Sequence, residues 1–363
     1  MKSKRAVAAL AALLSATLPG AEPWRVITAP LDLTFPADHG AHPDHRTEWW
    51  YLTGLVAGPA NRRFGYQLTF FRQGFKFGPP PPGTSELDPR HALAAHLAVA
   101  DLRQGRLHHA QRLRRAAADL AGFTTGDLHV WVENWELRRN DGDVLTLAAV
   151  DREAGIGLQL RLAPTRPLVR HGEGGVSRKG DEPGNASAYL SWTRLATAGT
   201  LHVDGSTFTV TGESWLDHEW GSTQLGADVV GWDWLGARLA DGRDLMVYRL
   251  RRADGSASPH SAGTVVRPDG STLALGAADL ELVPLTHWTS PRTGATYPAQ
   301  LRLRIPRAGL DLQVTPLLAD AEIDGRASTG VVYWEGPVAL SGSTLGEGYL
   351  ELTGYAAPLT GRL

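Results

Sequence analysis

Three short segments of this 363-residue chain combine tryptophan with acidic side chains. They are RTEWWYLTG at residues 46–54, GESWLDHEWG at 212–221 and GWDWLGARL at 231–239. A carboxylate among indoles is partly desolvated, which raises its pKa and keeps it available as a proton donor. The same residues fit a structural alternative, in which buried carboxylates accept hydrogen bonds from indole and arginine N–H groups. Both readings require these segments to converge in the fold.

Each of the three segments lies in, or at the end of, a probable strand, so alternate side chains share a face. In the second segment, Asp217 and Glu219 should lie opposite His218 and Trp220. A histidine close to a carboxylic acid can hold or relay its proton. The segment therefore carries groups for acid–base chemistry on both faces of one strand.

A metal site receives little support from the spacing of possible ligands. His39, His42 and His45 recur every third residue, but Gly40 and Pro43 place them in a loop rather than on a helix. The chain has no cysteine and no HExxH motif. The consecutive residues of DHE at 217–219 cannot all reach one ion from a regular strand. We therefore expect no metal ligands.

Nucleophilic and cofactor chemistry also lack their usual signals. Ser214 is the only serine beside these segments, and no G-x-S-x-G motif occurs. The GEGG at residues 172–175 neither follows a strand nor opens a helix, so it does not predict a phosphate site. The sequence predicts that no cofactor is bound.

The N-terminus is typical of a secretory signal. Lys2, Lys4 and Arg5 precede the apolar run AVAALAALLSATL and the small residues of LPGA. The run is too short to span a bilayer, so residues 1–21 are expected to be a signal peptide cleaved near Ala21. No later segment could span a membrane. The mature chain should reside in the periplasm or outside the cell, and without cysteine it cannot form disulfides.

Composition and periodicity favour an all-β protein. The chain contains Gly 41 and Pro 23, and residues 156–162 alternate strictly between apolar and other side chains. Asp-Gly pairs begin at residues 204, 241, 254 and 269, and such pairs favour hairpin turns. Helical signals are confined to residues 108–120 and the segment near Ala92. The net charge of −2 provides no basic field for nucleic acid.

Two stretches interrupt the predicted strands. Residues 78–83, GPPPPG, must form a stiff exposed loop because proline cannot donate to a ladder. Residues 171–187 are rich in glycine and charge and are too long for a hairpin turn, so they form either a functional loop or a mobile one. A domain boundary is predicted between Thr223 and Val230, which gives domains at residues 22–225 and 226–363.

Several motifs together resemble the carotenoid 1,2-hydratase family, and most closely its secreted lipocalin-like, AttH-type branch. These motifs follow one another from about Asp38 to the C-terminus: HPDHRTEWWYLTG, HLAVADL, GEGGVSRKG with ASAYLSWTRL, GESWLDHEWGS, and YWEGPVALSG with GEGYLELTGY. The resemblance implies two lipocalin-like (calycin-type) β-barrel or sandwich domains, packed together with few short helices. It also implies an apolar ligand in a cavity at or near their junction.

The family's shared motif positions fall in this chain on Glu48, Trp49, Trp50, Tyr51, Asp217, His218, Trp220, Gly221, Trp232 and Asp233. Glu219, His96, Trp234 and Tyr248 are predicted as site residues in addition to these positions. The predicted catalytic residues are Asp217, His218, Glu219 and Asp233. The predicted ligand-binding residues are Glu48, Trp49, Trp50, Tyr51, His96, Trp220, Trp232, Trp234 and Tyr248. In a hydratase, Asp217 or Glu219 would protonate an alkene with His218 as partner, indole faces would stabilise the cation, and Tyr51 or Asp233 would position water.

Two functions fit these residues. The first is a secreted protein that binds an isoprenoid, polyene or lipid and hydrates a C=C bond without a cofactor. The second is a non-catalytic periplasmic carrier of lipids or isoprenoids that works with a membrane transporter complex. An enzyme would be selective and pH-dependent, whereas a carrier would accept several apolar ligands.

Overall fold

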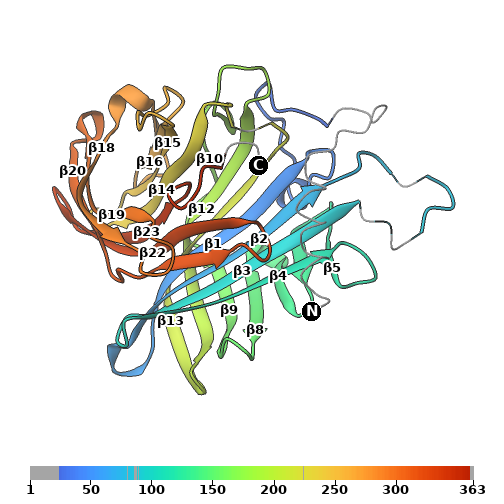
Figure 1. The fold of residues 1–363 in the computed structure, drawn as a ribbon, viewed down its shortest axis with the longest axis horizontal. Helices are drawn as coiled ribbons and strands as arrows, with labels where there is room; N and C mark the ends of the chain where they lie inside the picture. The colour runs from blue at the N-terminus through green and yellow to red at the C-terminus, as the bar shows by residue number, and fades with distance from the viewer. Residues whose placement is uncertain (1–23, 80, 86–87, 89, 224, 360–363) are drawn as a thin grey trace.

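The computed structural model describes residues 24–79, 81–85, 88, 90–223 and 225–359, and its strands form two strongly curled antiparallel sheets (Figure 1). The predicted all-β fold with two barrel-like sheets is confirmed. The signal peptide expected at residues 1–21 lies outside the described residues.

The first sheet has 13 strands, drawn in blue to yellow-green in Figure 1. Its main path runs β4-β3-β2-β1-β13-β12-β9-β8-β7-β6-β5, and β10 and β11 pair with β12. The strands are β1 (Thr47–Ala57), β2 (Arg63–Gly74), β3 (His91–Asp101), β4 (Arg106–Arg115), β5 (Ala121–Phe123), β6 (His129–Val132), β7 (Trp135–Arg139), β8 (Leu145–Asp151), β9 (Ile156–Pro164), β10 (Val169–Arg170), β11 (Val176–Arg178), β12 (Ala186–Val203) and β13 (Ser206–Gly221).

The second sheet has 10 strands and follows the first in the chain. Its main path runs β17-β16-β15-β14-β23-β22-β20-β19-β18, and β21 pairs with β22. The strands are β14 (Val229–Leu239), β15 (Asp244–Arg252), β16 (Ala262–Val266), β17 (Thr272–Leu275), β18 (Glu281–Thr289), β19 (Thr296–Ile305), β20 (Leu310–Pro316), β21 (Glu322–Gly325), β22 (Val331–Gly342) and β23 (Gly346–Leu352).

The helices of the described residues are single 3-10 turns, and none is long and apolar enough to cross a membrane. These turns are η2 (Ala37–His39), η3 (Pro59–Asn61), η4 (Asp141–Asp143), η5 (Ala277–Asp279) and η6 (Pro306–Ala308).

Alternating side chains give each sheet an inner apolar core and a face toward the other sheet. In β1, Trp50 and Leu52 pack inside the first sheet, whereas Tyr51 packs with Trp234 of β14. Leu235, next to Trp234, belongs to the core of the second sheet. A third cluster of buried side chains, from β1, β12 to β15 and β23, therefore lies between the sheets. This arrangement determines which predicted site residues can meet.

The Asp-Gly hairpins form where the sequence predicts them. At Asp204 and Gly205, between β12 and β13, φ is 48° and 75°, as a type I′ turn requires. Asp241 and Gly242 join β14 to β15, and Asp269 and Gly270 join β16 to β17. The two long strands β12 and β13 thus pair as neighbours, which holds the segment GESWLDHEWG in the middle of the first sheet.

The helical expectations are wrong. Residues 106–115 form strand β4, which pairs along its whole length with β3, and the segment near Ala92 is β3 itself. The alanine- and arginine-rich sequence has good helix propensity, but pairing with a buried neighbouring strand outweighs it. Most β4 side chains are half-buried, so the arginine stems cover apolar surface while their charged ends stay accessible.

The segment at residues 171–187 is held against both sheets. It contains β11, which pairs with β12, and the Asn185 side chain donates a 2.8 Å hydrogen bond to the Thr223 carbonyl. His171, Lys179 and Asn185 are all buried. The segment therefore packs at the junction of the sheets, and its functional role stays a prediction.

Candidate functional site

Asp217 on β13 is the centre of a buried cluster between the sheets. Its carboxylate accepts hydrogen bonds from the Tyr189 hydroxyl at 2.7 Å, from Trp215 Nε1 at 2.5 Å and from Ser191 Oγ. Trp234 Nε1 of the second sheet donates to the Tyr189 oxygen at 2.8 Å. Burial raises the pKa of Asp217 to about 6, although these hydrogen bonds oppose the shift. Asp217 can therefore carry a proton in mildly acidic solution.

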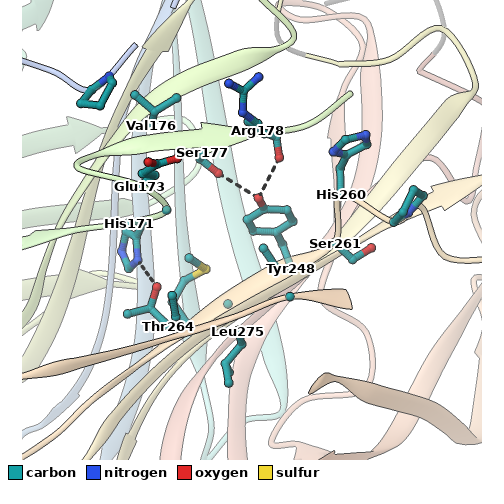
Figure 2. Close-up of a pocket in the computed structure, with 18 of the residues that line it drawn as sticks. His171, Glu173, Val176, Ser177, Arg178, Tyr248, His260, Ser261, Thr264 and Leu275 are labelled. Carbon is teal, nitrogen blue, oxygen red and sulfur yellow. Dashed lines mark hydrogen bonds between the residues drawn. The ribbon is translucent and has the colours of Figure 1, made fainter. Parts of the chain in front are cut away.

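A cavity of about 260 Å³ adjoins this cluster (Figure 2). It lies between the 171–178 segment of the first sheet and strands β15 to β17 of the second, and His171 and Tyr248 line its wall. His171 Nε2 lies 2.7 Å from Ser191 Oγ, and its Nδ1 lies 2.9 Å from Thr264 Oγ1. A hydrogen-bonded chain thus runs from the cavity wall through Ser191 to Asp217.

The order of donors and acceptors along this chain is fixed by the Ser191 hydroxyl, which donates its hydrogen to Asp217. The Ser191 oxygen therefore accepts a hydrogen bond from His171 Nε2–H, and His171 Nδ1 accepts one from the Thr264 hydroxyl. Burial lowers the pKa of His171 to about 3, so the imidazole is neutral. A neutral imidazole that donates at one nitrogen and accepts at the other can pass a proton between the cavity and the acid.

A buried ion pair lies beside the cluster. Lys179 of the 171–187 segment contacts Glu219, which also accepts a hydrogen bond from Ser187. The Lys179 ammonium lies 5.3 Å from the ring centres of both Tyr189 and Tyr248. Burial lowers the pKa of Lys179 to about 7. The pair fastens the cavity-lining segment to β13.

The second sheet adds two further acids that sequence reasoning missed. Glu335 and Glu351 are directly opposite each other on β22 and β23. Burial and repulsion from Glu351 hold the pKa of Glu335 well above its ordinary value, and the Tyr51 hydroxyl is the neighbouring group that opposes this shift. Burial and the Asp217 charge raise the pKa of Glu351 to about 7. Three carboxyl groups in one aromatic region therefore have raised pKa values, and each keeps its proton to a higher pH than a free acid does.

Glu351 gives a direct test of this electrostatic environment. A raised folded-state pKa stabilises the chain below the ordinary value of 4.5, and that stabilisation is lost as the pH rises to about 7. Glu351→Gln keeps an acceptor for Trp232 Nε1 but does not titrate. Relative to this variant, the wild type is expected to lose about 3 kcal/mol of unfolding free energy across that pH range. Urea unfolding of both proteins at several pH values measures the difference, and a constant difference would mean that Glu351 ionises normally.

Glu48, Trp50, His218 and Trp220 lie inside the first sheet, on the faces of β1 and β13 opposite Tyr51 and Asp217. The Glu48 carboxylate accepts from His218 Nε2 at 2.8 Å and from Arg72 Nε at 2.8 Å. Trp50 stacks on His218 with ring centres 5.0 Å apart. The expected partnership of His218 with Asp217 is therefore not formed, because strand alternation directs them to opposite sides of the sheet.

Two other predicted residues lie apart from the Asp217 cluster. Asp233 points into the second sheet, where it pairs with Arg249 at 2.6 Å and Arg251 at 3.1 Å. Contrary to expectation, it cannot position water for Asp217, since its neighbours Trp232 and Trp234 occupy the face that meets the first sheet. His96 bonds to Tyr333 and Ser328 at a different part of the contact between the sheets.

The structure thus brings together about half of the predicted site residues. Those in or beside the Asp217 cluster are Trp49, Tyr51, Asp217, Glu219, Trp232, Trp234 and Tyr248. The residues that sequence reasoning missed there are His171, Lys179, Tyr189, Ser191, Glu335 and Glu351. All six lie in motifs that carry the family resemblance or in the 171–187 loop, which is the signal by which they could have been found.

Two curled antiparallel sheets that enclose acid groups and aromatic side chains between them define this molecule as a lipocalin-like β protein. The AttH-like family model matches residues 26–355, so the chain belongs to the AttH-like family. The predicted resemblance to the AttH-type branch is confirmed.

Solved structures agree with this assignment. A Nitrosomonas europaea protein assigned as AttH is 36% identical over 93% of this chain and 100% of its own length, with a TM-score of 0.80. Kievitone hydratase from Nectria haematococca is 16% identical over 93% of this chain and 98% of its own, with a TM-score of 0.68, and therefore shares the fold. No curated protein matches the chain.

Proposed function

We propose that this protein binds an apolar polyene, isoprenoid or lipid between its two sheets and adds water to a C=C bond without a cofactor, in the periplasm or outside the cell. The observation that carries the proposal is a set of three carboxyl groups with raised pKa among indole and phenol rings: the buried Asp217 and Glu335 and the half-buried Glu351. The hydratase named among the structural neighbours has the same fold.

The reaction begins with proton transfer from a carboxylic acid to the alkene. Asp217 is the donor in this scheme, and the π electrons form the new C–H bond, which leaves a carbocation on the neighbouring carbon. The faces of Trp232 and Trp234 stabilise that charge, by up to about 2 kcal/mol each where water is excluded. A water molecule then adds to the cation and returns a proton to the carboxylate, so the net change is the addition of one water.

The hydrogen-bonded chain of His171 and Ser191 provides a route by which Asp217 gains its first proton, since each turnover returns a proton to the carboxylate. Since it connects Asp217 with the cavity, it can equilibrate the acid with solvent protons while the ligand covers the aromatic cluster. Tyr248, which lines the same cavity, places a hydroxyl next to Ser177 at 2.8 Å and can orient a polar end of the ligand (Figure 2).

One observation favours the carrier alternative. Both oxygens of Asp217 already accept hydrogen bonds, so the carboxylate has the arrangement of a structural group that fixes the neighbouring rings. In that case the cavity and aromatic wall hold an apolar ligand for delivery to a membrane transporter, and no bond is made or broken.

Incubation with an acyclic polyene in heavy-oxygen water separates the two functions. Lycopene, presented in detergent, is expected to quench tryptophan fluorescence and to yield a product that contains heavy oxygen. Native mass spectrometry with lipid extraction of protein taken from the periplasm would show which ligand class is bound in the cell. Quenching without oxygen incorporation across several apolar ligands supports a carrier, and absence of both binding and incorporation overturns the proposal.

A further inference from the structure

Two histidines and a glutamate converge inside the first sheet, away from the Asp217 cluster. His42 comes from the loop before β1, Glu48 from β1 and His218 from β13, and their ligand atoms all lie within 4.8 Å of one another. His42 Nδ1 lies 2.9 Å and His218 Nε2 2.8 Å from the same oxygen, Glu48 Oε1. We infer that these three side chains bind one divalent metal ion of the zinc class.

The donor set matches the chemistry of zinc. Two imidazole nitrogens and one carboxylate oxygen form a common set of protein ligands for catalytic Zn²⁺, which leaves a fourth position for water. Ligand atoms around tetrahedral Zn²⁺ are about 3.3 Å apart, given bonds of about 2.0 to 2.1 Å. The two nitrogen–oxygen separations need to widen by about half an ångström, and the two imidazole nitrogens, which lie within 4.8 Å of each other, need to reach the same spacing. The ion would replace the ring protons that now point at Glu48.

Surrounding side chains orient each ligand, as second partners do in metal sites. Asp38 Oδ1 lies 3.1 Å from His42 Nε2, which directs Nδ1 toward the centre of the group. Arg72 Nε holds the other Glu48 oxygen at 2.8 Å, and Arg72 Nη2 donates to the His42 and His45 carbonyls at 2.9 Å. The loop that carries His42 is thereby fixed to β2.

Aromatic stacking fixes the planes of both imidazoles. The Trp220 ring lies 3.7 Å from His42 with an interplanar angle of 4°, and Trp50 stacks on His218. His42 faces a carboxylate at each ring nitrogen, Asp38 and Glu48, and these two acids raise its pKa. The imidazolium and the Arg72 guanidinium together balance the two carboxylates, so a bound cation would displace the His42 proton that points at Glu48.

A cavity of about 10 Å³ adjoins His218 and Trp50, but its wall is mainly apolar and includes neither His42 nor Glu48. The fourth ligand position is therefore inferred from the coordination chemistry of zinc alone. Ligand spacing along the chain does not predict this site, because His218 is 170 residues from Glu48 and only the pairing of β1 with β13 brings them together.

Metal titration of untagged, EDTA-treated protein tests the inference. Isothermal titration with Zn²⁺ is expected to show one equivalent bound, Co²⁺ to give the visible absorption of a tetrahedral site, and Mg²⁺ not to compete, because nitrogen donors disfavour it. His42→Gln and His218→Gln should lose this binding. Asp38→Asn should weaken it about 10- to 100-fold by releasing the His42 ring.

His129→Gln serves as the matched control, because His129 also pairs with a glutamate, Glu136 at 3.3 Å, but outside the group. The His129→Gln variant should retain full metal binding. Because His42 lies in a loop and is partly exposed, His42→Gln is the ligand variant least affected by folding defects. The Co²⁺ spectrum of the wild-type protein tests the site without any substitution. Folded wild-type protein without stoichiometric Zn²⁺, or unchanged binding in His42→Gln, would overturn the inference. The hydration assay is independent of this result.

Discussion

Replacing Lys179 with methionine is expected to lower the free energy of unfolding by about 3 to 5 kcal/mol. Lys179 and Glu219 are 7% and 4% exposed, and the variant leaves the Glu219 carboxylate buried with Ser187 as its remaining hydrogen-bond donor. Urea unfolding at pH 6, below the Lys179 pKa of about 7, keeps the ammonium charged in the wild type. Tryptophan fluorescence and far-ultraviolet circular dichroism should report the same transition if the unfolding is two-state.

Two further variants identify the cause of this loss. The double variant Lys179→Met with Glu219→Leu removes both charges and should recover most of the stability, since apolar side chains of similar size can replace a buried pair. Arg326→Met breaks the exposed pair with Asp324 and should change stability by no more than about 1 kcal/mol. A Lys179→Met loss as small as that of Arg326→Met would contradict the assigned role of the buried pair.

The fold could be predicted from local features of the sequence. Period-two alternation identified strands such as β9, and Asp-Gly turns located the hairpins β12–β13 and β14–β15, because both signals depend on residues close together in the chain. The prediction of a helix at residues 108–120 was wrong because the deciding factor is not local. The segment does have helix propensity, but its pairing with strand β3 depends on the fold as a whole.

The site could be predicted only in part. Strand alternation correctly separated Asp217 from His218, but it does not tell which face of β13 meets the second sheet. Pairing of β1 with β13 sets Tyr51 opposite Asp217, and no local pattern specifies that register. Glu335 and Glu351 appear in the sequence as isolated acidic residues within strands, and only packing between the two sheets buries Glu335 and covers part of Glu351.

Asp217→Asn is expected to reduce hydration by two to four orders of magnitude, about the usual contribution of a general acid. The amide cannot supply a proton, yet the aromatic walls that contact an apolar ligand are unchanged, so ligand affinity should stay close to that of the wild type. Rates come from heavy-oxygen incorporation, and affinities from tryptophan quenching with the same polyene. Equal turnover in the variant would remove Asp217 from the mechanism and favour the carrier function.

Asp244→Asn provides the matched control for this prediction. Asp244 is also fully buried, but it pairs with Arg166 and Arg194, away from the cavity. The control should lose stability without losing turnover per folded molecule.

The pH profile of the wild-type protein adds a separate criterion. Since the acid form of Asp217 is required, wild-type turnover should fall about tenfold per pH unit above about 6. A structural carboxylate would leave binding and turnover flat across that range, so the profile separates proton transfer from a role in packing.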